Sequence, residues 1–225
     1  MSLAQLTLDL PHRAALGAED FLVSDCNRAA VKLIDAWPQW SDQVQLLIGP
    51  AASGKTHLAR VWQALSGAEA LDPATLRMDF VDRMEAATPL VVEDADRAAY
   101  EEKALFHLLN LAREHRLFVL LTARSVPSRW RVSLPDLLSR LNASPAVEIG
   151  PPDEALIRTV MLKQFADRQL DIDPKVLTYL ALHVDRSLAA AAAAVAAVDR
   201  AALATGRKIS RQLVTEVLAG TAPRD

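Results

Sequence analysis

The segment from Gly49 to Thr56 constrains the fold of this chain more than any other feature. It reads Gly-Pro-Ala-Ala-Ser-Gly-Lys-Thr and matches the pattern G-x-x-x-x-G-K-[ST] in full. The apolar run Val44–Ile48 precedes it, and a helical pattern over Thr56–Leu65 follows it. A strand, a glycine-rich loop and a helix in this order form a phosphate cradle. A chance glycine turn before a helix is the alternative, and the agreement of all three parts disfavours it.

The residues of this loop have distinct tasks. Gly49 and Gly54 let the backbone turn so that several N–H groups point at phosphate oxygens. The helix that starts near Gly54 adds the positive end of its dipole. Lys55 is expected to reach the β- and γ-phosphates, and the Thr56 hydroxyl to take one magnesium position. We therefore expect ADP or ATP to bind here with Mg, against Gly49, Pro50, Ala51, Ala52, Ser53, Gly54, Lys55 and Thr56.

A nucleotide site of this kind needs a second strand that ends in acidic residues. The apolar run Leu90–Val92 is followed by Glu93 and Asp94, so both acids are expected at the carboxyl end of a strand. Glu93 would join Thr56 at the magnesium, and both acids are candidates for a catalytic role. Glu93 stands where an aspartate is usual, so the pattern alone does not fix the magnesium geometry or predict hydrolysis. Asp96 is expected to cap the next turn; an ordinary acidic strand end is the alternative.

Runs of Val, Ile and Leu alternate with helical patterns along the first two thirds of the chain. They show little polar alternation, which is typical of strands covered on both faces of a parallel sheet. The expected strands are Val44–Ile48, Leu90–Val92, Phe118–Thr122, Val147–Ile149 and, more weakly, Glu69–Leu71. The expected helices among them are Asn27–Trp37, Thr56–Leu65 and Glu102–His115. The pattern predicts an α/β domain.

The triplet Gly150-Pro151-Pro152 marks a change of character, because it can neither continue a strand nor lie inside a helix. Only helical patterns follow it. They are Ala155–Arg168 with Asp153 as N-cap, one from Lys175, one over Ser187–Ala204 and a short one after Ser210. We therefore expect a tail over residues 1–17, an α/β nucleotide-binding domain over 18–150 and a small all-helical lid domain over 151–225.

Composition narrows the class of protein. The formal charge of −3 argues against a protein whose main task is to hold a nucleic acid backbone. The single cysteine, Cys26, excludes an internal disulfide and fits the cytoplasm. The N-terminus has no signal-like segment, and no apolar run reaches the ~18 residues of a membrane span. The longest run, Ala189–Val198, is followed by Asp199 and Arg200 and is expected to be a soluble helix.

Several segments resemble AAA+ proteins related to the bacterial replication initiator DnaA. The phrase Gly54-Lys55-Thr56-His57-Leu58 is typical of that family. The further segments that agree in order are Phe21–Ala30, Leu134–Leu141 and Val184–Leu188. The resemblance covers essentially Phe21 to Leu218. It implies an AAA+ domain followed by a helical lid, with Phe21–Ala30 packed around the adenine.

The same resemblance implies roles for two arginines. Arg140 corresponds to the arginine finger, which acts on a nucleotide bound by a neighbouring molecule, and Arg186 to the lid arginine that touches phosphates. From the residues alone, Arg140 could instead pair with Asp136 one helical turn away. Arg186 could be a solvated charge near Asp185.

Thr122 ends an apolar strand and is a candidate polar sensor between the phosphates and the acidic strand. The segment Arg124-Ser125-Val126-Pro127 lacks the Asp-Arg-Pro-Pro pattern common among relatives. We therefore expect weak ATP hydrolysis at most by the chain itself.

The N-terminal alternation Gln5-Leu6-Thr7-Leu8-Asp9-Leu10 is similar to peptides that bind the DNA polymerase III sliding clamp. Gln5 would form hydrogen bonds, and Leu6, Leu8 and Leu10 would fill pockets of the clamp groove. An edge strand is the alternative, because period-two alternation suits either.

No helix-turn-helix segment follows Leu218, and the stretch between the loop and the acidic strand is short. The resemblance then implies a regulator that binds the clamp and stimulates hydrolysis of DnaA-bound ATP, without sequence-specific DNA binding and with nucleotide-linked self-association. The alternatives are an adaptor or loader that recruits another replication protein, and a stand-alone ATPase.

Overall fold

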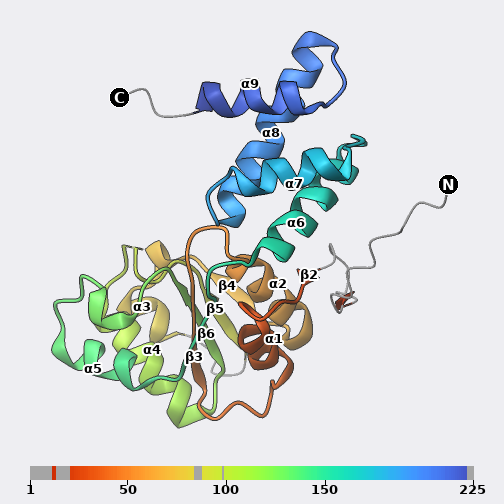
Figure 1. The fold of residues 1–225 in the computed structure, drawn as a ribbon. Coiled ribbons are helices and arrows are strands. Elements are labelled where there is room, and N and C mark those ends of the chain that lie inside the picture. The colour runs from red at the N-terminus through yellow and green to blue at the C-terminus, as the bar shows by residue number, and fades with distance from the viewer. Residues whose placement is uncertain (1–11, 14–20, 84–87, 98, 222–225) are drawn as a thin grey trace. The chain divides into compact units, whose positions relative to one another are not determined.

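The computed structural model describes residues 12–13, 21–83, 88–97 and 99–221. The chain forms two compact units, one up to Gly150 and one from Pro151 onward. The first unit is an α/β domain built on a parallel sheet, and the second contains helices in the part described (Figure 1). The expected fold class is confirmed.

The central sheet has five parallel strands. Their bounds are β3 Val44–Ile48, β4 Glu69–Leu71, β5 Leu90–Val92, β6 Val119–Ala123 and β7 Ala146–Glu148. Their order across the sheet is β4-β5-β6-β3-β7. β6 and β7 each lie one residue away from the expected strand. The register pairs Ile48 with Ala123 and Val92 with Leu121, so the loops after β3, β5 and β6 leave from one edge.

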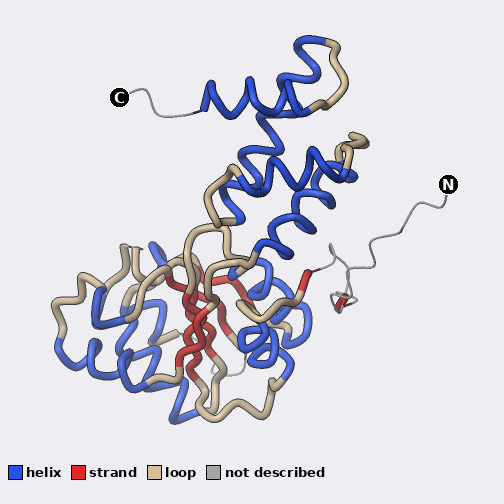
Figure 2. The backbone as a smooth tube through the Cα atoms, in the orientation of Figure 1, coloured by secondary structure: helices blue, strands red, loops and turns tan. Residues whose placement is uncertain are grey.

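Helices cover both faces of this sheet (Figure 2). The helices of the first unit are α1 Arg28–Asp35, α2 Lys55–Ser66, α3 Met78–Val81, α4 Glu102–His115 and α5 Pro135–Ala143. Short turns lie at η1 Pro73–Thr75 and η2 Pro127–Arg129. One core joins α3, α4 and α5 to one side of the strands, and another joins α1 and α2 to the other. All side chains of β3, β5 and β6 are buried, which explains why these strands are mostly apolar, with Gln45 and Thr122 as polar exceptions.

The aromatic residues of this unit serve packing. Trp40 and Trp62 are buried and stacked, with ring centroids 4.9 Å apart. Trp130 is also buried and donates a hydrogen bond to the Ser125 carbonyl over 2.7 Å. These three tryptophans therefore offer no exposed platform for stacking bases.

The first described residues form a short pair of strands. β1 His12–Arg13 pairs antiparallel with β2 Phe21–Leu22. His12 and Arg13 were expected in a tail outside the folded core, and their backbone instead pairs with the start of the α/β unit. Gln5, Leu6, Leu8 and Leu10 lie outside the described residues.

The second unit packs its helices around one apolar core. They are α6 Glu154–Asp167, α7 Pro174–Leu182, α8 Leu188–Thr205 and α9 Arg211–Thr221. Asp153 accepts a hydrogen bond from the Leu156 amide over 2.7 Å, and Ser187 accepts one from Ala190 over 3.0 Å. These caps satisfy amides that have no partner within the helix. Phe165 and Leu180 are fully buried in the core between the helices.

Helix α8 is long and apolar enough, by length and composition, to cross a membrane. Its 18 residues have a mean hydropathy of 1.5. We had expected no segment to reach this length. Four of its residues, Ala191, Val195, Val198 and Ala202, are buried against the other helices of the unit. Core helices of soluble proteins show the same composition, so α8 carries no argument for a membrane.

Candidate nucleotide-binding site

The loop after β3 is shaped by its two glycines. A Cβ atom on Gly49 would come within 2.7 Å of the Ser53 Oγ, and one on Gly54 within 2.8 Å of the Phe21 ring. Gly54 also has a φ of +97°, a left-handed conformation that favours glycine. Any side chain at either position would therefore displace its neighbours. The Ser53 hydroxyl is buried and has no hydrogen-bond partner, which fits a loop that receives a phosphate.

Lys55 begins α2 and is only 6% exposed. Its Nζ donates hydrogen bonds to the carbonyls of Gly49 over 2.8 Å and Pro50 over 2.9 Å. Burial lowers the pKa of Lys55 below its usual value, and nearby Asp94 opposes that effect. A buried ammonium held at the first turn of a helix is suited to an anionic ligand.

The acidic residues meet the loop at the carboxyl edge of the sheet. Thr56 Oγ1 donates a hydrogen bond to Glu93 Oε2 over 2.5 Å. The Asp94 amide donates to Thr122 Oγ1 over 3.0 Å, and Asp94 has a φ of 49°. Parallel register explains the meeting of Asp94 with Thr122, because β5, which ends just before Glu93, pairs with β6, which contains Thr122. The expected residues Lys55, Thr56, Glu93, Asp94 and Thr122 therefore form one cluster.

Asp96 differs from our expectation that it caps the next turn. Its Oδ2 accepts hydrogen bonds from the Arg124 amide over 3.0 Å and from Ser125 Oγ over 3.2 Å. The carboxylate thus joins the loop after β5 to the loop after β6. The pattern of short polar residues near a strand end could not distinguish a local cap from this longer-range contact.

Two aromatic rings lie over the start of α2. The Phe21 ring stacks on the His57 ring, with centroids 4.9 Å apart and planes at 15°. Phe21 was expected near the adenine, whereas His57 was treated as structural or exposed. The sequence feature that could have predicted the contact of His57 with Phe21 is its position directly after Thr56.

Among the residues described, no group of three or more His, Cys, Asp or Glu side chains is arranged to hold a metal ion. A Mg ion bound through a nucleotide does not need such a group, because phosphates and waters supply most of its ligands. Thr56 and Glu93, the residues expected at the Mg ion, lie within hydrogen-bond distance of each other.

The two arginines implied by the resemblance are both exposed. Arg140 lies on α5, and its guanidinium forms no ion pair or hydrogen bond with the rest of the described chain. The alternative pairing with Asp136 is therefore not formed, although both residues are on one helix. Arg186 lies in the second unit before α8 and is likewise without an ion pair to a described residue.

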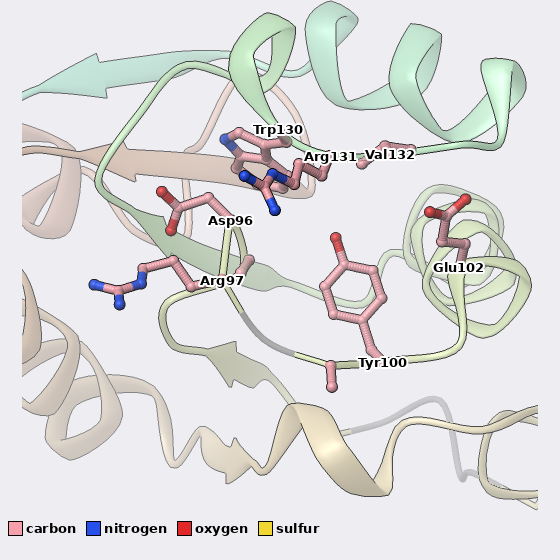
Figure 3. A pocket seen from close by; sticks show the side chains of 9 residues that line it. Asp96, Arg97, Tyr100, Glu102, Trp130, Arg131 and Val132 are labelled. Carbon is pink, nitrogen blue, oxygen red and sulfur yellow. The ribbon is translucent and has the colours of Figure 1, made fainter.

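A hollow of about 530 Å³ lies beside the cluster but contains no residue of the loop. Tyr100 lines this hollow, and Figure 3 shows its hydroxyl pointing toward Trp130 and Arg131. Burial, Glu102 and Asp96 raise the pKa of Tyr100 to about 12. Glu102 is engaged by the Ser133 and Leu134 amides, so its carboxylate organises the chain before α5.

The architecture is that of AAA+ domains. Domain III of the Thermotoga maritima replication initiation protein DnaA has a TM-score of 0.76 and 16% identity, covering 90% of this chain and 95% of that domain. AMPPCP-bound DnaA from Aquifex aeolicus has a TM-score of 0.63 and 17% identity, covering 80% of this chain and 63% of that one. The chain therefore has the AAA+ fold.

The fold is shared beyond DnaA. The Thermotoga maritima RuvB Holliday junction branch migration motor has a TM-score of 0.67 and 14% identity, covering 87% of this chain and 68% of that one. No protein-family model matches the sequence, and no curated protein matches it.

Proposed function

We propose that this chain is a DnaA-related regulator of the kind called Hda. In this proposal it binds the sliding clamp and stimulates hydrolysis of DnaA-bound ATP in the cytoplasm. The observation that carries the proposal is the unpaired, exposed guanidinium of Arg140 on a DnaA-like AAA+ body. A guanidinium supplied to a neighbour's γ-phosphate stabilises charge that develops during phosphoryl transfer and contributes about 10³–10⁵ in rate.

The chain's own nucleotide has a different task in this proposal. ADP or ATP would lie against the loop of Gly49–Thr56, with Lys55 on its phosphates and Thr56 and Glu93 holding Mg. When bound, Mg would neutralise part of the phosphate charge. Thr56 is hydrogen-bonded to Glu93, and the Asp94 amide to Thr122. In this proposal the bound nucleotide orders the domain around these residues. Arg186 would hold the helical unit to those phosphates.

The clamp would bring the regulator to its target. Gln5, Leu6, Leu8 and Leu10 form the proposed clamp peptide, whose support is its sequence pattern alone. An extended peptide with one amide and three apolar side chains suits a groove that reads alternate residues.

The direct test mixes this protein, clamp loaded on DNA and ATP-bound DnaA, and follows conversion of the DnaA-bound ATP to ADP. We expect conversion to rise well above that of DnaA alone, and to require the clamp. No stimulation at any concentration of the protein would contradict the proposal and favour an adaptor or a stand-alone ATPase.

A paired variant separates clamp binding from chemistry. The double change Gln5→Ala, Leu6→Ala should abolish co-elution with the clamp in gel filtration while nucleotide binding is unchanged. The matched control is Thr7→Ala, Asp9→Ala, which alters the intervening positions and should still co-elute. Clamp binding by the first variant would refute the tail assignment.

A further inference from the structure

The loop after β6 places an arginine against the acid of the nucleotide site. Arg124 Nε lies 3.6 Å from Asp94 Oδ1. Its charge also reaches Lys55, whose pKa it lowers in addition to the larger effect of burial. Lys55, Asp94 and Arg124 therefore form one electrostatic cluster at the site where the phosphates are expected.

The geometry on both sides of this contact is fixed by the backbone. The Arg124 amide donates to Asp96 Oδ2 over 3.0 Å, and Ser125 Oγ donates to the same oxygen. Asp94 is held by its own amide, which donates to Thr122 Oγ1 over 3.0 Å. Replacing the Arg124 side chain would leave all of these contacts in place. The arginine can thus be removed without removing the scaffold that positions Asp94.

The contact with Arg124 bears on whether Asp94 can act as a general base. A carboxylate activates a water by accepting its hydrogen bond and then its proton, which requires an available oxygen and undiminished negative charge. Asp94 is half exposed, so water can reach it, yet a guanidinium lies against one of its oxygens. The guanidinium in this position occupies the side of the carboxylate oxygen that a water would need.

We propose that Arg124 is a restraining residue that suppresses ATP hydrolysis by the chain itself by pairing with Asp94. This proposal rests on the proposed role of the site, which is to hold a nucleotide while Arg140 acts elsewhere. The same arginine, if it instead bound the γ-phosphate, would promote ATP binding and turnover. The two roles predict opposite effects of its removal.

The test uses the full chain alone with MgATP, so it is independent of clamp and DnaA. R124A should raise kcat for ATP hydrolysis about tenfold or more, a part of the roughly 10²–10⁴ that a positioned general base contributes, and leave KM within about threefold. R124K, which keeps a cation there, should remain as slow as the unaltered protein. Arg60→Ala, an exposed arginine on α2, is the control and should not change turnover.

A double variant tests whether Asp94 is the residue that Arg124 restrains. The double variant R124A/D94N should return to the slow rate, because the amide cannot accept the proton. Should R124A lower the melting temperature, R124Q repeats the measurement with a longer uncharged side chain. No rise in kcat, a rise in KM with kcat unchanged or lower, or a fast R124A/D94N enzyme would overturn the proposal. Stimulation of DnaA bears only on the proposed function.

Discussion

The two units of the chain bury different kinds of side chain. Among the residues described, the buried polar and charged ones all belong to the first unit: Ser24, Asn27, Gln45, Ser53, Lys55, Thr122 and Ser144. The buried side chains described in the helical unit are apolar, among them Met161, Phe165 and Leu180. Burying a polar group without a partner costs free energy. Most of these groups have hydrogen-bond partners within the fold, whereas the buried Ser53 hydroxyl has none among the described residues.

This contrast separates stability from binding. Lys55 satisfies its ammonium with loop carbonyls, and the Ser53 hydroxyl has no partner. Both lie where a phosphate is expected. In the helical unit Asp153 caps a helix, and Arg207 and Glu216 form a pair at the surface. We expect changes in the first unit to affect ligand affinity, and changes in the second to affect folding.

The largest expected effect is on the helical unit. Phe165→Ala should destabilise it by about 3–5 kcal/mol, because Phe165 is fully buried and its removal leaves a cavity. Hydrogen exchange measured separately for amides of 151–221 and 21–150 would locate the loss. Leu162→Ala on the same helix is the control, since Leu162 is 46% exposed and should cost far less. An equal loss in both variants would contradict the packing described here.

The next largest expected effect is a loss of ADP affinity when the buried ammonium of Lys55 is removed. Lys55→Ala should weaken ADP binding roughly 100-fold, about 3 kcal/mol, through lost charge-assisted hydrogen bonds to the phosphates. The melting temperature of the free protein should fall little, because burial already disfavours the charged form of Lys55. Isothermal titration and thermal melting give the two numbers. The control is Lys32→Ala, which changes an exposed lysine on α1 and should leave ADP binding unchanged. A large loss of stability in the Lys55 variant with unchanged ADP affinity would contradict the expectation that changes in the first unit affect binding.

The smallest effect is at a helix cap. Asp153→Ala should cost about 1 kcal/mol, because the Leu156 amide loses its side-chain acceptor at the start of α6. Chemical denaturation measures the loss, with the exposed Asp171→Ala as control. A cost near zero would mean that water replaces the cap fully.

Much of this structure could be predicted from local pattern. The strand Val44–Ile48 and the helix Glu102–His115 were predicted with their observed ends, because both have strong apolar periodicity and clear boundaries. The helix Met78–Val81 was not predicted: it has only four residues, too few to show a period. The pairing of His12 and Arg13 with β2 was not predicted, because two residues of backbone pairing leave no pattern in sequence.

The site divides in the same way. The loop, Glu93 and Asp94 could be predicted because they come at the ends of mostly apolar strands, and Thr122 because it lies near the end of β6. Arg124 and the link from Asp96 to Ser125 could not, because they join residues 28 to 30 positions apart, and only the sheet register makes them neighbours. The stacking of Phe21 on His57 was missed for the same reason.

One measurement tests the central claim most directly. Conversion of DnaA-bound ATP to ADP should be compared for the unaltered chain and for Arg140→Ala, with clamp loaded on DNA in both cases. The variant should bind ADP and clamp normally, because the Arg140 guanidinium forms no hydrogen bond or ion pair with the described residues, and should lose nearly all stimulation. Arg60→Ala should retain it. Full stimulation by Arg140→Ala would contradict the claim that this residue acts on the neighbour's nucleotide.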